Sequence, residues 1–166
     1  MHKLHLLALA FLAAAGSPEA AAADINRSAI TMPAGACQSA LPVFDGVIRK
    51  RPLGVQNEGT TAAFVTCGAT TPGQARTSRV VLAFNNSNSH DVTIACTLVA
   101  GYTESTAVYR PQSVTIPANW GDAMFWVPTQ LPSGIPYFAS AAFSCTLPPG
   151  TGITRVQTSY TEDVGQ

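Results

Sequence analysis

Apolar and polar residues alternate along most of the chain beyond the first two dozen positions. In residues 92–98 every second side chain, from Val92 to Leu98, is apolar or a cysteine. Residues 137–145 show the same alternation, with Cys145 on the more apolar face. Successive side chains of a β-strand leave opposite faces, so a period of two is typical of a half-buried strand. No segment of this region shows the period of about 3.6 residues that predicts an amphipathic helix. The pattern therefore predicts an all-β fold.

Turn-forming residues divide the alternating pattern into short segments. Glycine adopts positive φ at such corners and proline cannot donate a hydrogen bond to a sheet, so clusters of both mark strand ends. About eight to ten short antiparallel strands at this spacing predict a disulfide-stapled β-sandwich. We expect residues 79–85 and 92–98 to form a hairpin through the polar turn 85–90. The remaining strands are expected at residues 46–51, 53–57, 62–68, 113–117, 123–128, 137–145 and 153–162.

Residues 1–23 form a predicted secretory signal peptide. A basic start precedes the apolar run Leu6–Ala15, and small residues lead to a cleavage site after Ala23. The apolar run is too short for a membrane-spanning helix, which needs about 20 residues. We therefore expect cleavage, no membrane span afterwards, and a secreted or periplasmic protein. Residues 24–36 are expected to be a flexible N-terminal arm, and residues 37–166 a single β-sandwich domain.

Composition excludes several classes of protein. Nine basic and nine acidic residues give a net charge of zero, and only 11% of residues are charged. A disordered chain, a coiled coil or a basic nucleic-acid-binding protein needs a stronger bias of charge or composition. With 46% hydrophobic residues, the chain can build a substantial core. We expect no nucleic-acid partner.

The four cysteines all lie beyond the predicted signal peptide, in the part of the chain that export would bring into an oxidising compartment. Their spacing contains no C-x-x-C pair of the kind that holds a zinc ion. We therefore expect two disulfides. Three pairings are possible, and we favour Cys37–Cys67 and Cys96–Cys145, because each joins segments that the strand pattern makes expected neighbours.

No catalytic constellation stands out in the sequence. His90 is the one histidine beyond the signal peptide, and it lies in a polar turn of a chain without a G-x-S-x-G motif. Neither a metal site, a cofactor nor a phosphate-binding loop is indicated. Two carboxylates held roughly 5–10 Å apart could support glycoside hydrolysis. Glu104 and Glu162 are the residues to substitute in a test of that alternative.

Two groups of residues are candidates for ligand binding. Arg49, Lys50 and Arg51 form a basic cluster that could contact an anionic envelope polymer, although a charged strand followed by proline also protects a sheet edge. Trp120 lies in a turn and is a candidate for an exposed aromatic platform that stacks on a sugar ring. Trp126 alternates with its neighbours, and the pattern leaves open which of the two faces is core.

Short segments spread over the chain resemble a known group of proteins. They are Phe44-Asp45-Gly46, Ile48-Arg49-Lys50-Arg51-Pro52, Gln56-Asn57-Glu58-Gly59-Thr60, Phe64-Val65-Thr66-Cys67, Phe143-Ser144-Cys145 and Leu147-Pro148-Pro149-Gly150. Together they are similar to a group of uncharacterised small secreted proteins of Gram-negative bacteria, over nearly the whole chain beyond the signal peptide. The resemblance implies export and a disulfide-bonded β fold. It implies no activity and no site residues.

These observations predict an exported, non-enzymatic β-sandwich protein that binds a cell-envelope component, glycan or protein. One alternative is an assembly or adhesion subunit, in which residues 24–36 add a strand to a neighbour's sheet. Another alternative is a carboxylate-based glycoside hydrolase.

Overall fold

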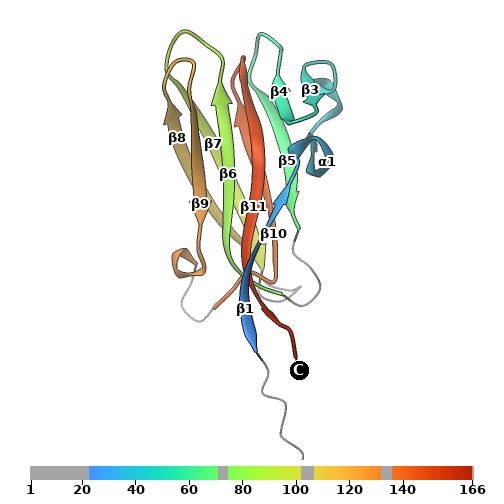
Figure 1. The fold of residues 1–166 in the computed structure, drawn as a ribbon. Coiled ribbons are helices and arrows are strands. Elements are labelled where there is room, and N and C mark those ends of the chain that lie inside the picture. Colours follow the sequence, from blue (N-terminus) through green and yellow to red (C-terminus); the bar gives the residue numbers. More distant parts are fainter. Residues whose placement is uncertain (1–22, 71–74, 102–106, 132–135, 166) are drawn as a thin grey trace, which may run out of the picture.

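The fold is described by a computed structural model. Residues 1–22, which include nearly all of the predicted signal peptide, and Glu104 lie outside the described part of the chain. Within that part, the chain forms the predicted all-β fold, with two antiparallel sheets packed as a sandwich (Figure 1). No helix among the described residues combines the length and the apolar character that a membrane crossing requires. The described residues are 23–70, 75–101, 107–131 and 136–165.

Within the described ranges, eleven strands make up the two sheets, and all their pairings are antiparallel. Sheet A has the order β3-β4-β11-β6-β9, with β1 also paired to β11, and sheet B has the order β2-β5-β10-β7-β8. The strands of sheet A are β1 (Asp24–Thr31), β3 (Ile48–Arg51), β4 (Gly54–Asn57), β6 (Arg76–Asn86), β9 (Gly121–Trp126) and β11 (Thr151–Asp163). The strands of sheet B are β2 (Cys37–Ser39), β5 (Ala63–Ala69), β7 (Val92–Gly101), β8 (Ala107–Ile116) and β10 (Ser140–Leu147). The helical pieces are α1 (Pro33–Ala36) and the 3-10 turns Pro42–Phe44 and Pro128–Gln130.

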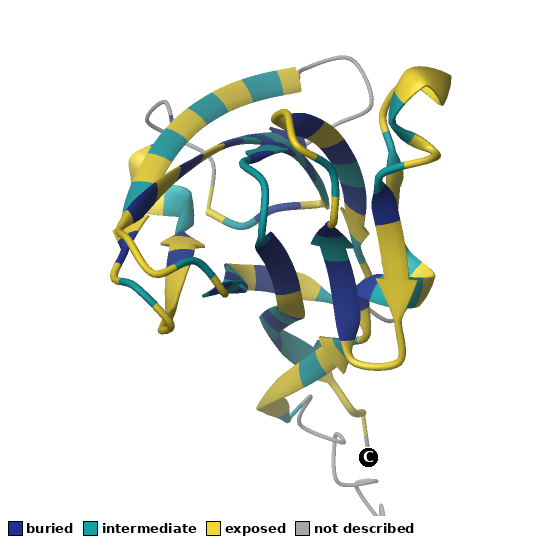
Figure 2. Ribbon diagram, turned by 90° about the horizontal axis from the view of Figure 1, so that it is seen from above, coloured by how far each residue is buried: buried dark blue, intermediate teal, exposed yellow. Residues whose placement is uncertain are grey.

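The core lies between the sheets, where every second side chain of most strands points inward. Buried and exposed residues alternate along the strands in Figure 2. On β9, Met124 and Trp126 are buried, and Phe125 faces solvent. This settles which face of β9 belongs to the core. The indole N–H of Trp126 donates to the backbone carbonyl of Arg110 at 3.1 Å, so its polar atom keeps a partner although the ring is fully buried.

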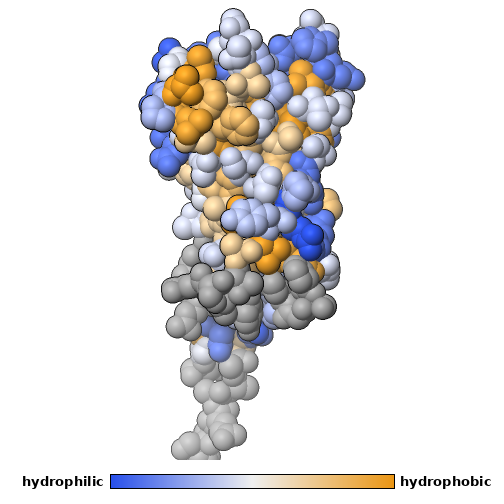
Figure 3. All heavy atoms as spheres, turned by 180° about the vertical axis from the view of Figure 1, so that it is seen from behind, coloured by the Kyte–Doolittle hydropathy of each residue, from blue (hydrophilic) through white to orange (hydrophobic). Residues whose placement is uncertain are grey.

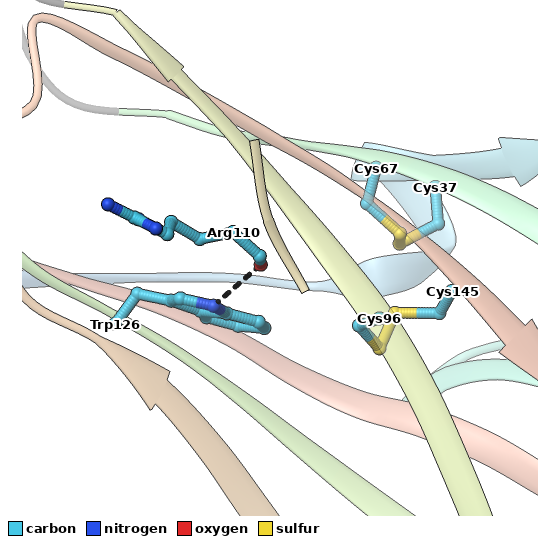
Figure 4. Close-up of a disulfide and its surroundings, with 6 residues drawn as sticks. All are labelled: Cys37, Cys67, Cys96, Arg110, Trp126 and Cys145. Carbon is cyan, nitrogen blue, oxygen red and sulfur yellow. Dashed lines mark hydrogen bonds between the residues drawn. A yellow bond between two sulfur atoms is a disulfide. The ribbon is translucent and has the colours of Figure 1, made fainter. Parts of the chain in front are cut away.

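Both disulfides lie in sheet B, on its buried face. Cys37–Cys67 joins β2 to β5, and Cys96–Cys145 joins β7 to β10 (Figure 4). In each bond the two cysteines are directly opposite in the strand register. These are the pairings favoured from the sequence. They tie neighbouring strands of one sheet, so the two sheets are held together by packing and by the connections at their ends.

The predicted hairpin of residues 79–85 and 92–98 is wrong. β6 pairs with β11 and β9 in sheet A, whereas β7 pairs with β10 and β8 in sheet B. The turn between them therefore crosses from one sheet to the other. Strands alternate in the same way whether the turn between them closes a hairpin or crosses the sandwich, so the alternation could not separate the two cases.

A buried asparagine stabilises this crossing. Asn86, the last residue of β6, is only 2% exposed. Its side-chain amide donates to the carbonyl oxygens of His90 at 2.8 Å, Ile116 at 3.1 Å and Pro117 at 3.1 Å. Its side-chain oxygen accepts the backbone N–H of Asn88 at 2.9 Å. One side chain thus satisfies backbone groups that leave their sheets at this point.

Asn57 repeats the same arrangement between β4 and β5. It is fully buried and donates to the carbonyl oxygens of Thr61 at 2.8 Å and Leu147 at 2.7 Å. Its side-chain oxygen accepts the N–H of Gly59 at 2.9 Å. In both asparagines the amide reaches a carbonyl four residues ahead, and the oxygen accepts an N–H two residues ahead. The two crossings are therefore built alike.

Residues 24–36 differ from the flexible arm expected for them. β1 pairs with β11 over its whole length, from Asp24 opposite Asp163 to Thr31 opposite Val156, and α1 follows. No residue of β1 is buried. Because the strand covers no core, its sequence lacks a strong apolar alternation, and the pairing of its backbone with the edge of β11 decides its structure.

Candidate functional site

Four connections between the two sheets meet at one end of the sandwich, which we call the arch end. The N–H of Gly150 donates to the carbonyl of Asn57 at 2.9 Å, and the N–H of Ser87 donates to the carbonyl of Gly150 at 2.9 Å. The N–H of Asn119 donates to the carbonyl of Asn88 at 3.0 Å. Backbone bonds therefore link neighbouring connections and brace this end of the molecule. The connections run through residues 57–63, 86–92, 116–121 and 147–151.

Trp120 sits on this braced end with its ring in solvent. Its N–H donates to the carbonyl of Pro117 at 3.2 Å, and its carbonyl accepts the N–H of Asn86 at 2.8 Å. Asn119 has a φ of 54°, a left-handed conformation that asparagine tolerates better than most residues. The Trp120 side chain is 68% exposed. The residue is thus exposed, as expected from the sequence, on a backbone that is hydrogen-bonded on both sides.

A wide, open depression of about 630 Å³ adjoins Trp120. The depression is lined by Asn85, Asn86, Ser87, Asn119, Trp120 and Gly121. Amide, hydroxyl and indole groups therefore lie side by side around it, and together they can pack against a flat apolar ring and hydrogen-bond to its substituents.

One row of outward-facing positions continues from this depression across sheet A. Gly121 is opposite Asn85, Asn85 is opposite Gly152, Gly152 is opposite Gln56, and Gln56 is opposite Arg49. Asn85, Gln56 and Arg49 each adjoin a buried residue of their own strand, and Gly121 shares its side of β9 with the exposed Phe125. The five positions therefore form a row on the outer side of sheet A, which we call the outer row, although Gly152 itself is buried within it. The sequence analysis missed Gln56 and Asn85, because only the register of five strands brings them into line with Trp120.

Strand geometry divides the predicted basic cluster. Arg49 and Arg51 project from β3 on the outer side, while Lys50 shares the side of Ile48 and lines a separate depression of about 500 Å³. Arg51 forms an ion pair and a hydrogen bond at 2.8 Å with Glu58. Of the three residues, Arg49 alone belongs to the outer row.

The described carboxylates are mostly engaged in local surface contacts. Asp91 accepts the N–H of Ala118 at 3.1 Å, and Glu162 forms an ion pair with Arg27. His90 lies exposed in the β6–β7 connection. No group of three or more His, Cys, Asp or Glu side chains in the described ranges could hold a metal ion.

No protein-family model and no curated protein matches the sequence. Among solved structures, the chain is similar to the family 11 carbohydrate-binding module from Clostridium thermocellum in complex with a beta-1,3-1,4-mixed-linked tetrasaccharide. The identity is 8% and the TM-score 0.40, over 82% of this chain and 86% of that chain. TmCBM61 in complex with beta-1,4-galactotriose gives 9% and 0.35, over 82% and 84%, and a CBM4 structure gives 10% and 0.35, over 84% of both. Likeness at this level establishes neither a family nor a function.

Proposed function

We propose that the protein is an exported, non-enzymatic β-sandwich that binds a glycan of the cell envelope at the arch end. The observation that carries this proposal is Trp120, a large aromatic side chain that stands 68% exposed beside a depression lined with amides. An exposed indole with no core to cover is unusual in a soluble domain and favours a binding role.

The surroundings of Trp120 suit a sugar ring. The C–H face of a sugar is apolar and packs against an indole, while its hydroxyls need hydrogen-bond partners that both donate and accept. Asn85 and Asn119 line the depression and carry such amides. The bonds that fix the backbone of Trp120 would reduce the entropy lost on binding, since little of the site has to become ordered.

Export and the absence of catalysis are parts of the same proposal. Two disulfides suit a protein that works in an oxidising compartment, and the resemblance to secreted proteins of Gram-negative bacteria agrees with this. The carboxylate-based hydrolase alternative gains no support from the arch end. The described lining of the depression beside Trp120 includes no acidic side chain.

Replacing Trp120 by alanine is expected to weaken glycan binding by about 2 kcal/mol, roughly thirtyfold, because the stacking surface is lost. Affinity is measured by calorimetric titration, after a panel of envelope polysaccharides has been screened by co-sedimentation. Tyr109→Ala is the matched control, since Tyr109 is 65% exposed on the outer face of sheet B. Unchanged affinity in Trp120→Ala, or an equal loss in Tyr109→Ala, would contradict the proposal.

A second candidate function is assembly through β1. This strand makes an eight-residue antiparallel pairing with β11, yet none of its residues is buried. Its side chains are tied mainly through the exposed ion pairs Arg27–Glu162 and Asp24–Arg76, which add little stability. The same strand of a second copy could make every one of these contacts, so exchange between copies would be easy.

Deletion of residues 24–31 tests this second candidate. If β1 is exchanged, the complete exported chain forms dimers or larger species whose share rises with concentration, and the deletion variant does not. Sedimentation velocity over a wide range of protein concentration measures both. A complete chain that stays monomeric at every concentration would rule out assembly through β1.

A further inference from the structure

We propose that the glycan is an acidic polysaccharide, which lies across the outer face of sheet A with its carboxylates on Arg49 and Arg155. The proposal rests on the glycan site at Trp120 and adds the class of glycan that this site takes. It is carried by the register of the outer row, its glycines and its charge.

The outer row runs from the Trp120 depression to Arg49, and we call this line of positions the track. Neighbouring strands of a sheet lie about 4.8 Å apart, so the track from β9 to β3 is ~19 Å long, enough for several sugar units. It lies across the upper ends of the labelled strands in Figure 1. Asn85 also lines a second, smaller depression that reaches Arg51 and Gln56, so the surface is hollowed on both sides of this residue.

Two of the five positions in the outer row, Gly121 and Gly152, are glycines and place no side chain between the polar residues. A Cβ at Gly152 would lie 2.6 Å from the carbonyl oxygen of Val55 and 2.7 Å from the side-chain oxygen of Asn85. A Cβ at Gly121 would lie 2.9 Å from the carbonyl oxygen of Phe84. Side chains larger than hydrogen are therefore excluded at both positions. Gly121 leaves exposed backbone at the Trp120 end of the row, whereas Gly152 is buried under the side chain of Asn85.

Two arginines, Arg49 and Arg155, lie on or beside the outer row. Arg155 is opposite Ala83, which lies two residues before Asn85 on the same side of β6. Arg155 is therefore next to the outer row, and it is exposed like Arg49. The ion pairs of the described residues do not include either arginine. Among the described positions, neither the outer row nor the residues Arg155, Ala83 and Ala123 beside it include an acidic side chain. Two exposed arginines without a carboxylate between them complement a ligand of negative charge.

Uronic acids match this combination of groups. A guanidinium binds a carboxylate through two parallel N–H···O bonds, and the amides of Gln56 and Asn85 can bond to the ring hydroxyls. Trp120, at the far end of the track, offers the stacking surface. The two outer faces of the sandwich differ in the charge of their side chains. The outer face of sheet B is mostly pale to orange in Figure 3 and carries uncharged positions such as Thr93, Thr97 and Ser144.

Two polymers with the same sugar chain separate the effect of charge from that of the backbone. Polygalacturonate and its fully methyl-esterified form are titrated calorimetrically into the exported chain, Asp24–Gln166. The acidic polymer is expected to bind about tenfold more tightly, because each of the two exposed arginines strengthens binding about threefold. This preference is expected to disappear in Arg49→Gln/Arg155→Gln, whereas the affinity for the methyl ester stays within about twofold.

The matched control is Arg27→Gln/Arg76→Gln, which changes the net charge equally at residues outside the track. The control is expected to keep the preference for the acidic polymer. The proposal is overturned if polygalacturonate does not bind, if both polymers bind equally, or if the control loses the preference as well. Inorganic polyphosphate binding as tightly as polygalacturonate would also overturn it, since charge alone would then suffice.

Failure of the acidic class can be told apart from failure of the glycan site. Trp120→Ala is expected to weaken the binding of both polymers. If Trp120-dependent binding occurs without a preference for the acidic form, the site at Trp120 stands and the acidic class is wrong. If the preference occurs without any dependence on Trp120, the glycan site itself is wrong, and with it the proposal that rests on it.

Discussion

Replacing both cysteines of the central disulfide, in Cys96→Ala/Cys145→Ala, is expected to lower the free energy of unfolding by about 4 kcal/mol. The bond closes a loop between residues 49 apart in the sequence, and its loss lets the unfolded chain reach many more conformations. Both residues are buried, and they join β7 and β10, two strands with partners on both sides. Alanine is smaller than cysteine, so the vacated volume adds to the loss.

Urea denaturation, followed by circular dichroism, measures this effect. The comparison variant is Cys37→Ala/Cys67→Ala, which removes the same atoms from the edge of sheet B and opens a loop of 30 residues. Its expected loss is slightly smaller, about 3.5 kcal/mol by the same chain-entropy relation. A loss below about 1 kcal/mol for the central pair would show that the disulfide does not restrict the unfolded chain as argued.

The second large effect on stability is expected from Asn86→Ala, about 3 kcal/mol. The substitution leaves the carbonyl oxygens of His90, Ile116 and Pro117 without the amide that they share, and the N–H of Asn88 without its acceptor. Buried backbone groups that lose their partners cost much more than a hydrogen bond exposed to water.

Asn85→Ala is the matched control, because the two asparagines are adjacent and point to opposite sides of β6. The side chain of Asn85 donates to the hydroxyl of Ser87, at 3.3 Å in a partly exposed position, so a change within about 0.5 kcal/mol is expected. Thermal unfolding monitored by circular dichroism compares both variants with the wild type. Equal losses in the two variants would contradict the role assigned to Asn86.

The strands were predictable because burial between two sheets imposes a period of two. Residues 92–98 and 153–162 lie within β7 and β11, and the cysteines of each disulfide lie on buried faces of neighbouring strands. Alternation reports which side of a strand is buried. It does not report which strand lies beside it, and this is why the β6–β7 crossing was mistaken for a hairpin.

Segments without a buried face were harder to predict. β1 is held by its backbone pairing with β11 and covers no core, so its residues carry little sign of its structure. The asparagines at the crossings posed the opposite difficulty. Asn57 and Asn86 are among the most buried residues, although polar residues in a run of Asn, Ser and Gly are normally expected on the surface.

The candidate site was predictable only in part. Trp120 was expected to be exposed because it lies in a turn, and this property depends on neighbouring residues alone. The outer row depends on four strand pairings that join residues from Arg49 to Gly152, and no local pattern encodes such a register. The division of Arg49, Lys50 and Arg51 between two faces follows from strand alternation once β3 is known.

The proposed contact between Trp120 and a glycan is tested most directly by tryptophan fluorescence. The chain has two tryptophans, and Trp126 is fully buried, so Trp120 alone is placed to report a bound ligand. We predict that a binding polysaccharide shifts the emission of the wild-type protein to shorter wavelength. In Trp120→Phe, which keeps an aromatic ring, binding is retained in calorimetry while the shift disappears. A shift that persists in Trp120→Phe would place the ligand elsewhere and contradict the proposed site.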